Sequence, residues 1–279
     1  MSTGNWNWKR MRERYALATA APRPDARFES RWTWIDGIRM HCRGTRQDPP
    51  DRPPVVLVHG MAVSHRYLMP LAACLADHYP VRVVDLPGFG LSGGERARDL
   101  HELADGLAAW MEATGTAPAA VLANSFGTQI AVDLAVTHPE LVRSLILVGP
   151  TMDPRAPSML RQALRWVRGL PHEDPSQLPI LVRDLLDAGL VRAWHTFHVA
   201  LRDRVERKLP HVRAPVLVTR GAKEAVASQR WVEEVVRLLP HGESAVVPDS
   251  PHDATYTTPA ELAALVLPFL DRTSVEQPG

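Results

Sequence analysis

The feature that most constrains the chain is a short apolar run that ends at a serine and gives way to a helical pattern. The run covers residues 119–123, and the helix-like pattern extends from Phe126 to about His138, with Ser125 between them. A strand that turns sharply into a helix with a serine at the turn is the layout of a nucleophile elbow. Strand and helix nearly touch at such a turn, so small flanking residues are required, and Gly127 meets that requirement.

This turn would give the serine a chemical role. Its side chain would be exposed at the carboxyl end of the sheet. The N–H of Phe126 would lie at a helix N-terminus, where backbone donors are free and the helix dipole favours negative charge. We therefore expect Phe126 to supply one donor of an oxyanion hole. For the five residues alone, an ordinary serine N-cap is an equally good interpretation, and the rest of the chain has to decide between the two.

Apolar runs alternate with helical patterns along most of the chain. An Asp36-Gly37 pair between two alternating segments predicts a hairpin. Runs that are apolar throughout, followed each time by a helix, predict a parallel sheet with helices on both faces. The expected strands cover residues 54–58, 81–85, 119–123, 145–149, 215–219 and 244–247, and the expected helices cover 67–77, 99–112, 126–138, 228–239 and 259–270.

The alternation stops between residues 151 and 213. This stretch has no buried strand pattern, but it has helical stretches at 158–168, 178–188 and 191–208 that are separated by prolines. We interpret residues 151–213 as a helical cap inserted between two strands of a core formed by 30–150 and 214–272. Residues 1–29 are expected to form an N-terminal arm or helix, and 273–279 a flexible tail.

Composition narrows the class of protein. The 279 residues carry a formal net charge of +1, with 45% hydrophobic and 23% charged residues. These values are typical of a globular protein, and they predict neither a nucleic-acid partner nor a membrane partner. Two cysteines and only a weak apolar stretch near the N-terminus predict a cytoplasmic location. No phosphate-binding glycine motif occurs, so nucleotide binding lacks support. We expect the partner to be a small-molecule substrate. The sequence leaves the oligomeric state open.

A serine nucleophile needs a base and an acid, which an open α/β sheet would place on loops after its strands. His252 follows the last expected strand, and Glu224 follows the strand at 215–219. We predict that His252 is the base and that Glu224 orients it. Asp249 and Asp253 are alternatives for the acid, but they lie very close in sequence to the histidine that they would have to orient.

The second oxyanion donor is expected after the first central strand. His59-Gly60-Met61 ends that strand, and Gly60 permits a tight turn there. We predict that the N–H of Met61 completes the oxyanion hole. His59 is expected to form structural hydrogen bonds below the site, and residues 85–90 are expected to form a turn beside it.

Taken together, these motifs resemble the alpha/beta-hydrolase fold superfamily, of the capped serine hydrolase type. The resemblance covers about residues 30–270 and rests on His59-Gly60, residues 85–92, the elbow at Ser125, residues 221–224 and His252. It implies a mostly parallel eight-stranded sheet with helices on both faces and a helical cap, a Ser125–His252–Glu224 triad and no cofactor. Ala123, Thr128 and Pro251 stand where glycine is common, and Glu224 stands where aspartate is usual, but no functional group is lost.

The resemblance implies a serine hydrolase that cleaves a carboxylic ester or a related small acyl compound. The sequence motif Asn124-Ser125-Phe126-Gly127 is also similar to the motif of hydrolases that cleave carbon–carbon bonds in ring-fission diketones. The loops after His59-Gly60 and after His252 differ from theirs. A non-hydrolytic binding protein on the same fold is a third possibility.

The cap is expected to set specificity. We predict that Asn124, His65, Trp166 and Trp194 contact the substrate, and Phe197 and Met159 are further candidates for an acyl pocket. For the cap residues among them, packing between cap and sheet is an equally good interpretation. Residues 151–213 contain eleven Lys and Arg against seven Asp and Glu, which favours either an anionic substrate or a solvated helix face. His195 and His198 share a helix face without a third ligand, so no metal is expected.

Overall fold

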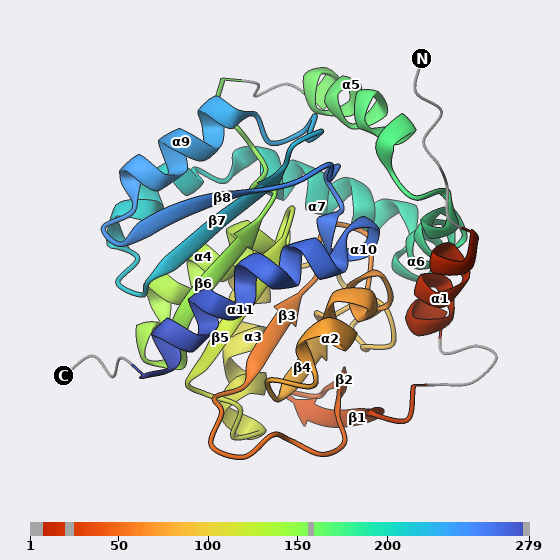
Figure 1. The fold of residues 1–279 in the computed structure, drawn as a ribbon, viewed down its shortest axis with the longest axis vertical. Coiled ribbons are helices and arrows are strands. Elements are labelled where there is room, and N and C mark those ends of the chain that lie inside the picture. The colour runs from red at the N-terminus through yellow and green to blue at the C-terminus, as the bar shows by residue number, and fades with distance from the viewer. Residues whose placement is uncertain (1–7, 20–24, 156–158, 276–279) are drawn as a thin grey trace.

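Eight strands form one sheet in the order β1-β2-β4-β3-β5-β6-β7-β8 (Figure 1). The computed structural model describes residues 8–19, 25–155 and 159–275. The strands are β1 (Phe28–Ile35), β2 (Ile38–Thr45), β3 (Val55–Val58), β4 (Val81–Val84), β5 (Ala119–Asn124), β6 (Val142–Val148), β7 (Val216–Gly221) and β8 (Gly242–Val247). The eight-stranded α/β prediction is confirmed.

The sheet is parallel from β4 to β8 and antiparallel at one edge. β1 and β2 form a hairpin that pairs antiparallel to β4 through β2. The two residues at its tip, Asp36 and Gly37, have φ values of 47° and 77°, which is the left-handed conformation that a tight two-residue turn requires. The Asp36-Gly37 prediction is therefore confirmed.

Helices follow most strands. The α-helices are α1 (Trp8–Thr19), α2 (Met69–Leu75), α3 (Leu100–Ala113), α4 (Gly127–Thr137), α5 (Met159–Gly169), α6 (Leu178–Ala188), α7 (Leu190–Arg202), α8 (Val205–Lys208), α9 (Gln229–Leu238), α10 (Ala254–Thr257) and α11 (Pro259–Val275). Short 3-10 turns are η1 (His65–Leu68), η2 (Pro139–Leu141), η3 (Leu170–His172), η4 (Pro175–Gln177) and η5 (Leu209–His211).

Two apolar cores flank the sheet because side chains alternate along each strand. Val56 and Val58 of β3 face a core built with α3, α4 and α9, whereas Val55 and Leu57 face a core built with α2 and α11. All four side chains are fully buried. Burial on both faces explains why the strand is β-branched or leucine throughout, and it fixes the sheet as the rigid base on which the loops after the strands are held.

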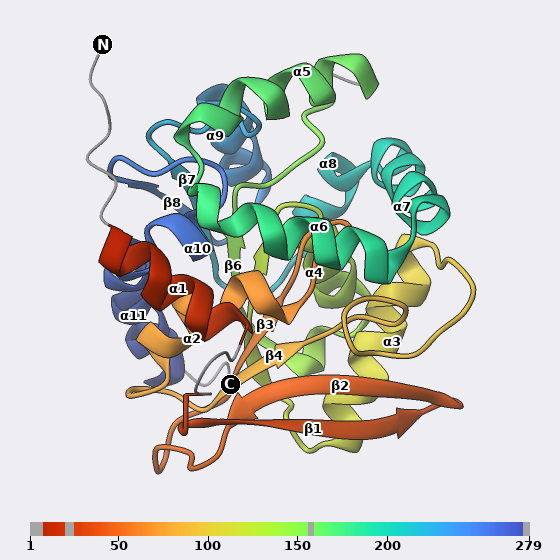
Figure 2. The same ribbon diagram turned by 90° about the vertical axis from the view of Figure 1, so that its right-hand side faces the viewer.

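The segment between β6 and β7 contains α5 to α8. Figure 2 shows α5, α6 and α7 in the upper half of the molecule, with the β1–β2 hairpin at the bottom. The single helix predicted for residues 191–208 is wrong, because α7 ends at Arg202 and α8 begins at Val205. Asp203 accepts a hydrogen bond from Gln129 Nε2 (2.9 Å) and pairs with Lys208 (2.7 Å), and these contacts hold the break.

The ends of the chain differ from the expected boundaries. β1 begins at Phe28, two residues before the predicted start of the core, and α11 continues to Val275, beyond the predicted end at residue 272. Helix α1 contacts α2 and η4, and Arg14 forms an ion pair with Asp174 at 2.7 Å. This helix therefore bridges the core and the segment between β6 and β7. Residues 276–279 of the predicted tail lie outside the described residues.

Candidate active site

The turn between β5 and α4 holds Ser125 in a strained backbone conformation. Its φ is 55°, a left-handed value that costs free energy in any residue with a Cβ atom. Gly127 lies so close to the neighbouring strand that a Cβ atom there would be 2.6 Å from the carbonyl oxygen of His59. The small residue expected at this position is therefore required by the close approach of helix and strand.

Three side chains from different loops meet at the turn. Ser125 Oγ lies 3.1 Å from His252 Nε2, and His252 Nδ1 lies 2.8 Å from Glu224 Oε2. The other carboxylate oxygen of Glu224 accepts the N–H groups of Val226 (2.7 Å) and Ala227 (3.1 Å). The carboxylate is thus fixed from both sides, and only one of its oxygens is directed at the imidazole.

Electrostatics couple the last two groups. Burial opposes ionisation of Glu224, but the His252 ring and the two backbone donors outweigh burial and lower the pKa of Glu224. Burial likewise disfavours the imidazolium, but the Glu224 carboxylate outweighs it and raises the pKa of His252. The arrangement therefore stabilises a positive charge on His252 once it has accepted a proton.

The loops that carry these side chains are closely packed. A Cβ atom on Gly221, at the end of β7, would lie 2.1 Å from the carbonyl oxygen of Ser250. Glycine at this position lets the loop that carries His252 lie directly against the loop that carries Glu224. Gly149, at the end of β6, has a φ of 57° and likewise leaves room for the His252 ring.

Free N–H groups flank the serine. The N–H of Phe126 lies at the N-terminus of α4. Among the described residues, neither the N–H of Phe126 nor the N–H of Met61 donates a hydrogen bond. Gly60, just before Met61, donates its N–H to Tyr67 Oη at 2.8 Å, and Tyr67 Oη donates to Asn124 Oδ1 at 2.9 Å. This chain of hydrogen bonds fixes the Met61 loop beside Ser125.

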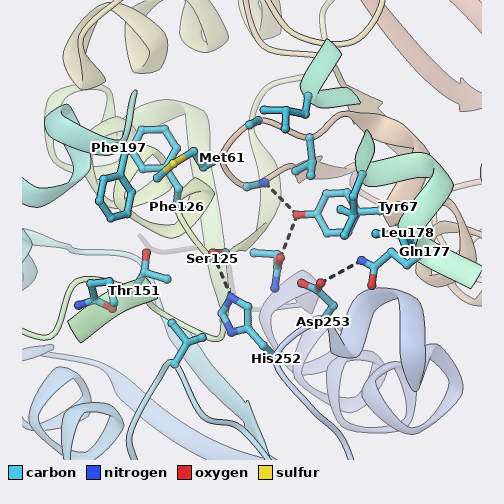
Figure 3. Close-up of a pocket in the computed structure, with 18 of the residues that line it drawn as sticks. Met61, Tyr67, Ser125, Phe126, Thr151, Gln177, Leu178, Phe197, His252 and Asp253 are labelled. Carbon is cyan, nitrogen blue, oxygen red and sulfur yellow. Dashed lines mark hydrogen bonds between the residues drawn. The ribbon is translucent and has the colours of Figure 1, made fainter. Parts of the chain in front are cut away.

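A largely apolar cavity of about 490 Å³ opens over the serine (Figure 3). Figure 3 shows Met61, Phe126 and Phe197 on one side of Ser125, and Tyr67 and Leu178 on the other. The segment between β6 and β7 forms much of its wall, and it contributes Gln162, Gln177, Leu178, Leu181, Val182, Leu185 and Phe197. The volume is in the range of small-molecule sites.

Comparison with known proteins agrees with this architecture. The alpha/beta hydrolase fold family matches residues 53–204. A pimeloyl-[acyl-carrier protein] methyl ester esterase of Neisseria meningitidis serogroup B (strain MC58) is 31% identical over an alignment of 259 residues that covers 83% of this chain and 98% of that protein. The chain belongs to the alpha/beta hydrolase fold family.

Solved structures show the same fold. A lipase structure from Acinetobacter baumannii has a TM-score of 0.75 at 19% identity, and the match covers 99% of this chain and 100% of that one. An esterase structure from Thermogutta terrifontis has a TM-score of 0.69 at 22% identity, covering 90% and 100%. At these identities the likeness concerns the fold alone. The present alpha/beta hydrolase therefore shares a scaffold with enzymes whose sequences differ widely.

Two residues expected to contact substrate lie elsewhere in this hydrolase. His65 is buried and directed at Asp85, whose carboxylate accepts both its N–H at 2.7 Å and its Nδ1–H at 2.8 Å. Trp194 lies on the outer surface of α7, against His198. Neither lines the cavity. Both predictions were drawn from residue type, which does not reveal the direction of a side chain.

The other expected contacts have different outcomes. Asn124 lines the cavity, but its amide binds Tyr67 Oη and the Val148 carbonyl oxygen, so it also has a structural role. Phe197 lines the cavity. Trp166 and Met159 belong to α5, but their side chains lie outside the described part of the structure.

Sequence reasoning missed a carboxyl group beside the histidine. Glu173 Oε1 accepts the N–H groups of His252 (3.0 Å) and Asp253 (3.3 Å). Burial, followed by the proximity of Asp253, raises the pKa of Glu173 to about 8. No local signal marks this residue, because its partners are about 80 positions away in the sequence. Gln177, which donates to Asp253 Oδ2 at 2.9 Å, was missed for the same reason.

One group among the described residues has the composition of a metal site. Ligand atoms of His41, His65 and Asp85 lie within 4.8 Å of one another and are buried. Asp85 Oδ2 already accepts hydrogen bonds from both imidazole Nδ1 atoms (2.8 Å each) and from the N–H of Leu91 (2.9 Å). An Nδ1 atom that donates its hydrogen has no lone pair for a metal, so this trio is a closed hydrogen-bond cluster.

In residues 8–19, 25–155 and 159–275, none of the helices has both the length and the apolar character needed to cross a bilayer.

Proposed function

We propose that the chain is an esterase that hydrolyses carboxylic esters with an apolar acyl group through an acyl-enzyme on Ser125. The observation that carries this is the continuous hydrogen-bonded series from Ser125 Oγ through His252 to Glu224, which opens into the cavity. The relative from Neisseria meningitidis is named for cleavage of a methyl ester, and this supports an ester as the bond cleaved.

The proposed reaction has two stages. Ser125 Oγ attacks the ester carbonyl carbon while His252 Nε2 accepts the hydroxyl proton. The N–H groups of Met61 and Phe126 bind the oxyanion, and Glu224 stabilises the imidazolium. The C–O bond then breaks as His252 gives its proton to the alcohol oxygen. In the second stage water attacks the acyl carbonyl, with His252 as base, and releases the acid and the free serine.

The cavity supports an apolar acyl group. Leu178, Leu181, Val182 and Leu185 of α6 line the cavity together with Met61 and the rings of Phe126 and Phe197. We propose that the acyl chain lies along α6 while its carbonyl oxygen faces the two N–H groups. The proposed reaction needs no cofactor.

A series of p-nitrophenyl esters with increasing acyl length tests this function. We expect kcat/KM to rise with chain length until the chain fills the cavity. The change Ser125→Ala should lower kcat by about ten-thousandfold or more without unfolding the protein. The matched control, Ser274→Ala on α11, should leave the rate unchanged. Ester turnover that persists in S125A would contradict the mechanism. Turnover of a vinylogous diketone but of no ester would favour carbon–carbon bond cleavage, and saturable ligand binding without turnover would favour a binding protein.

A further inference from the structure

Large apolar side chains that face solvent are concentrated on one part of the molecule. Of the fifteen such residues in the described chain, nine belong to α5, η3, α6 and α7. Six of them follow one another at helical spacing along α6 and α7, with exposed fractions from 50% to 83%. We name these six the outer strip: Leu178, Val182, Leu186, Leu190, Val191 and Trp194.

Helix α6 departs from the usual amphipathic arrangement in its middle turn. A surface helix ordinarily buries its apolar face and exposes its charges. Here Asp184 is buried, where it accepts a hydrogen bond from Ser64 Oγ at 2.8 Å and pairs with the buried Arg66. Val182 and Leu186, two positions to either side of Asp184, are exposed instead. Ile180 and Ala188 pack into the apolar cores, whereas the ion pair of Asp184 attaches the middle of the helix and leaves Val182 and Leu186 exposed.

The outer strip is continuous with the cavity. Leu178 and Val182 are exposed at the surface, yet both also line the cavity above Ser125. Leu181 and Leu185, one position before Val182 and Leu186, extend the apolar wall inward. An acyl chain could therefore pass from an apolar environment outside α6 to the serine without crossing a polar surface. In Figure 2, α6 lies toward the viewer between α1 and α7.

The segment that carries the outer strip exposes more basic than acidic side chains. In the described part of residues 151–213, eight arginines are exposed but only one acidic residue, Asp187, is exposed. Arg183 directly follows Val182 of the outer strip, and Arg161 and Arg168 are on α5. The acidic residues of this segment are largely turned inward: Asp153, Asp174 and Asp184 are buried. Arginines beside leucine, valine and tryptophan are the combination that interfacial helices present to anionic lipids.

We propose that the outer strip docks on the surface of an anionic lipid bilayer, with α6 and α7 in the headgroup region and the cavity mouth facing the acyl chains. Docking itself is independent of catalysis, whereas the entry of lipid-borne esters by this route rests on the proposed esterase function. The expectation from the sequence was the opposite, namely no membrane partner, because no apolar run approaches the length of a membrane span. An apolar surface shared by two helices produces no such run.

Vesicle flotation tests the docking directly. We expect the purified full chain to float with phosphatidylcholine vesicles that contain about 30% phosphatidylglycerol, and to float less with phosphatidylcholine alone or at high salt. The double variant Leu186→Glu/Val191→Glu changes two strip residues that do not line the cavity. It should reduce the bound fraction by about tenfold or more. Val275→Glu, at the far end of α11, is the matched control and should float like the wild type.

Two further readouts separate this inference from the proposed function. Ser125→Ala should float normally, and L186E/V191E should still hydrolyse a short water-soluble ester. Loss of hydrolysis in S125A together with normal flotation supports docking whatever the natural substrate is. The proposal is overturned if the wild type does not float with anionic vesicles at low salt, or if L186E/V191E floats equally well. If the wild type is a dimer that binds no vesicles and L186E/V191E is a monomer, the outer strip would instead be the interface between two copies of the chain. If the wild type bound an acidic protein but no vesicle, the proposal of docking on a bilayer would also be overturned.

Discussion

At the scale of single residues, the site is a set of carboxyl groups in different electrostatic environments around one imidazole. Glu224 receives two backbone N–H groups and faces His252, so its pKa is lowered. Glu173 is half-buried next to Asp253, and the loss of solvent together with this neighbouring carboxyl raises its pKa to about 8. One carboxyl is therefore ionised at neutral pH while the other largely keeps its proton. Glu224 is therefore the carboxylate that faces His252 Nδ1 and stabilises a positive charge on the ring.

Glu224→Gln should change both the rate and its pH dependence. The carboxylate stabilises the imidazolium, so its removal lowers the pKa of His252. The base must be neutral to accept the serine proton, and the acid limb of kcat/KM against pH should therefore move to lower pH. The plateau rate should fall by about a thousandfold or more, because the imidazolium loses its partner. Glu243→Gln, on the exposed surface, is the control. An acid limb that does not move would assign the orienting role to another residue.

Glu173→Gln should change how stability depends on pH. The pKa of Glu173 is raised to about 8 from 4.5 by burial and by Asp253. The folded state then binds more protons than the unfolded state between these values, and this group's contribution falls as pH rises through the window. Glutamine keeps the acceptor for the two backbone N–H groups but does not titrate. The difference between the free energies of unfolding of the wild type and of E173Q should fall by about 1–3 kcal/mol as the pH rises from about 5 to 8. This energy is set below the full value for such a pKa shift because the side chain is partly exposed to solvent. If the free energies of unfolding of the wild type and of E173Q changed in parallel with pH, this prediction would be contradicted.

At the scale of elements, the elbow depends on the close approach of α4 to β3. Sequence reasoning could locate β5, Ser125 and α4, because apolar runs and helical periodicity are local signals. The structure adds how near the elements lie: a Cβ atom on Gly127 would meet the carbonyl oxygens of His59 and Val58 at 2.6 and 2.9 Å. Both obstacles are backbone atoms at the end of a buried strand, which cannot move aside as a flexible side chain would.

Gly127→Ala should therefore destabilise the protein by about 1–3 kcal/mol or displace the elbow. The matched control is Gly169→Ala at the end of α5, where the nearest atom to a new Cβ would be 3.7 Å away. This second change should be neutral or slightly stabilising, because alanine has the higher helix propensity. Urea denaturation of both variants measures the difference. Equal stabilities would show that the contact at Gly127 is readily relaxed.

The elements that sequence reasoning misjudged are those shaped by tertiary contacts. Trp194 and Phe197 are three positions apart on α7, and only the orientation of that helix decides that Phe197 enters the cavity while Trp194 faces outward. The break between α7 and α8 is held by contacts of Asp203 with Gln129 and Lys208. By contrast, Ser125, His252 and Glu224, which the structure brings within hydrogen-bond distance of one another, could be proposed from the sequence because each follows a recognisable strand.

At the scale of the whole molecule, the segment between β6 and β7 is attached to the core by buried polar contacts and leaves apolar surface outside. Arg66 on the core pairs with Asp184 and Asp187 of α6. Arg192 of α7 donates to the carbonyl oxygens of Gly88 and Gly94. We propose that residues 151–213 act as a cap whose position over Ser125 depends on these few contacts.

Asp184→Ala tests this attachment. The change leaves the buried Arg66 with only Asp187 as an acidic partner, and it should cost about 2–4 kcal/mol of stability. Amide hydrogen exchange in α6 should accelerate more than exchange in β5, because the loss is local to the cap. Asp187→Ala, which removes the more exposed partner, should cost less than about 1 kcal/mol. Exchange that accelerates equally in α6 and β5 would show that cap and core unfold as one unit.

The most direct test of the central claim is to label the purified protein with a fluorophosphonate and to locate the adduct by mass spectrometry. The account predicts stoichiometric modification of Ser125, which requires the His252 base and the N–H groups of Met61 and Phe126 to act together. It also predicts that labelling is lost in His252→Ala. Labelling at another serine, or none at Ser125 under conditions where the protein is folded, would contradict the assignment of Ser125 as the nucleophile.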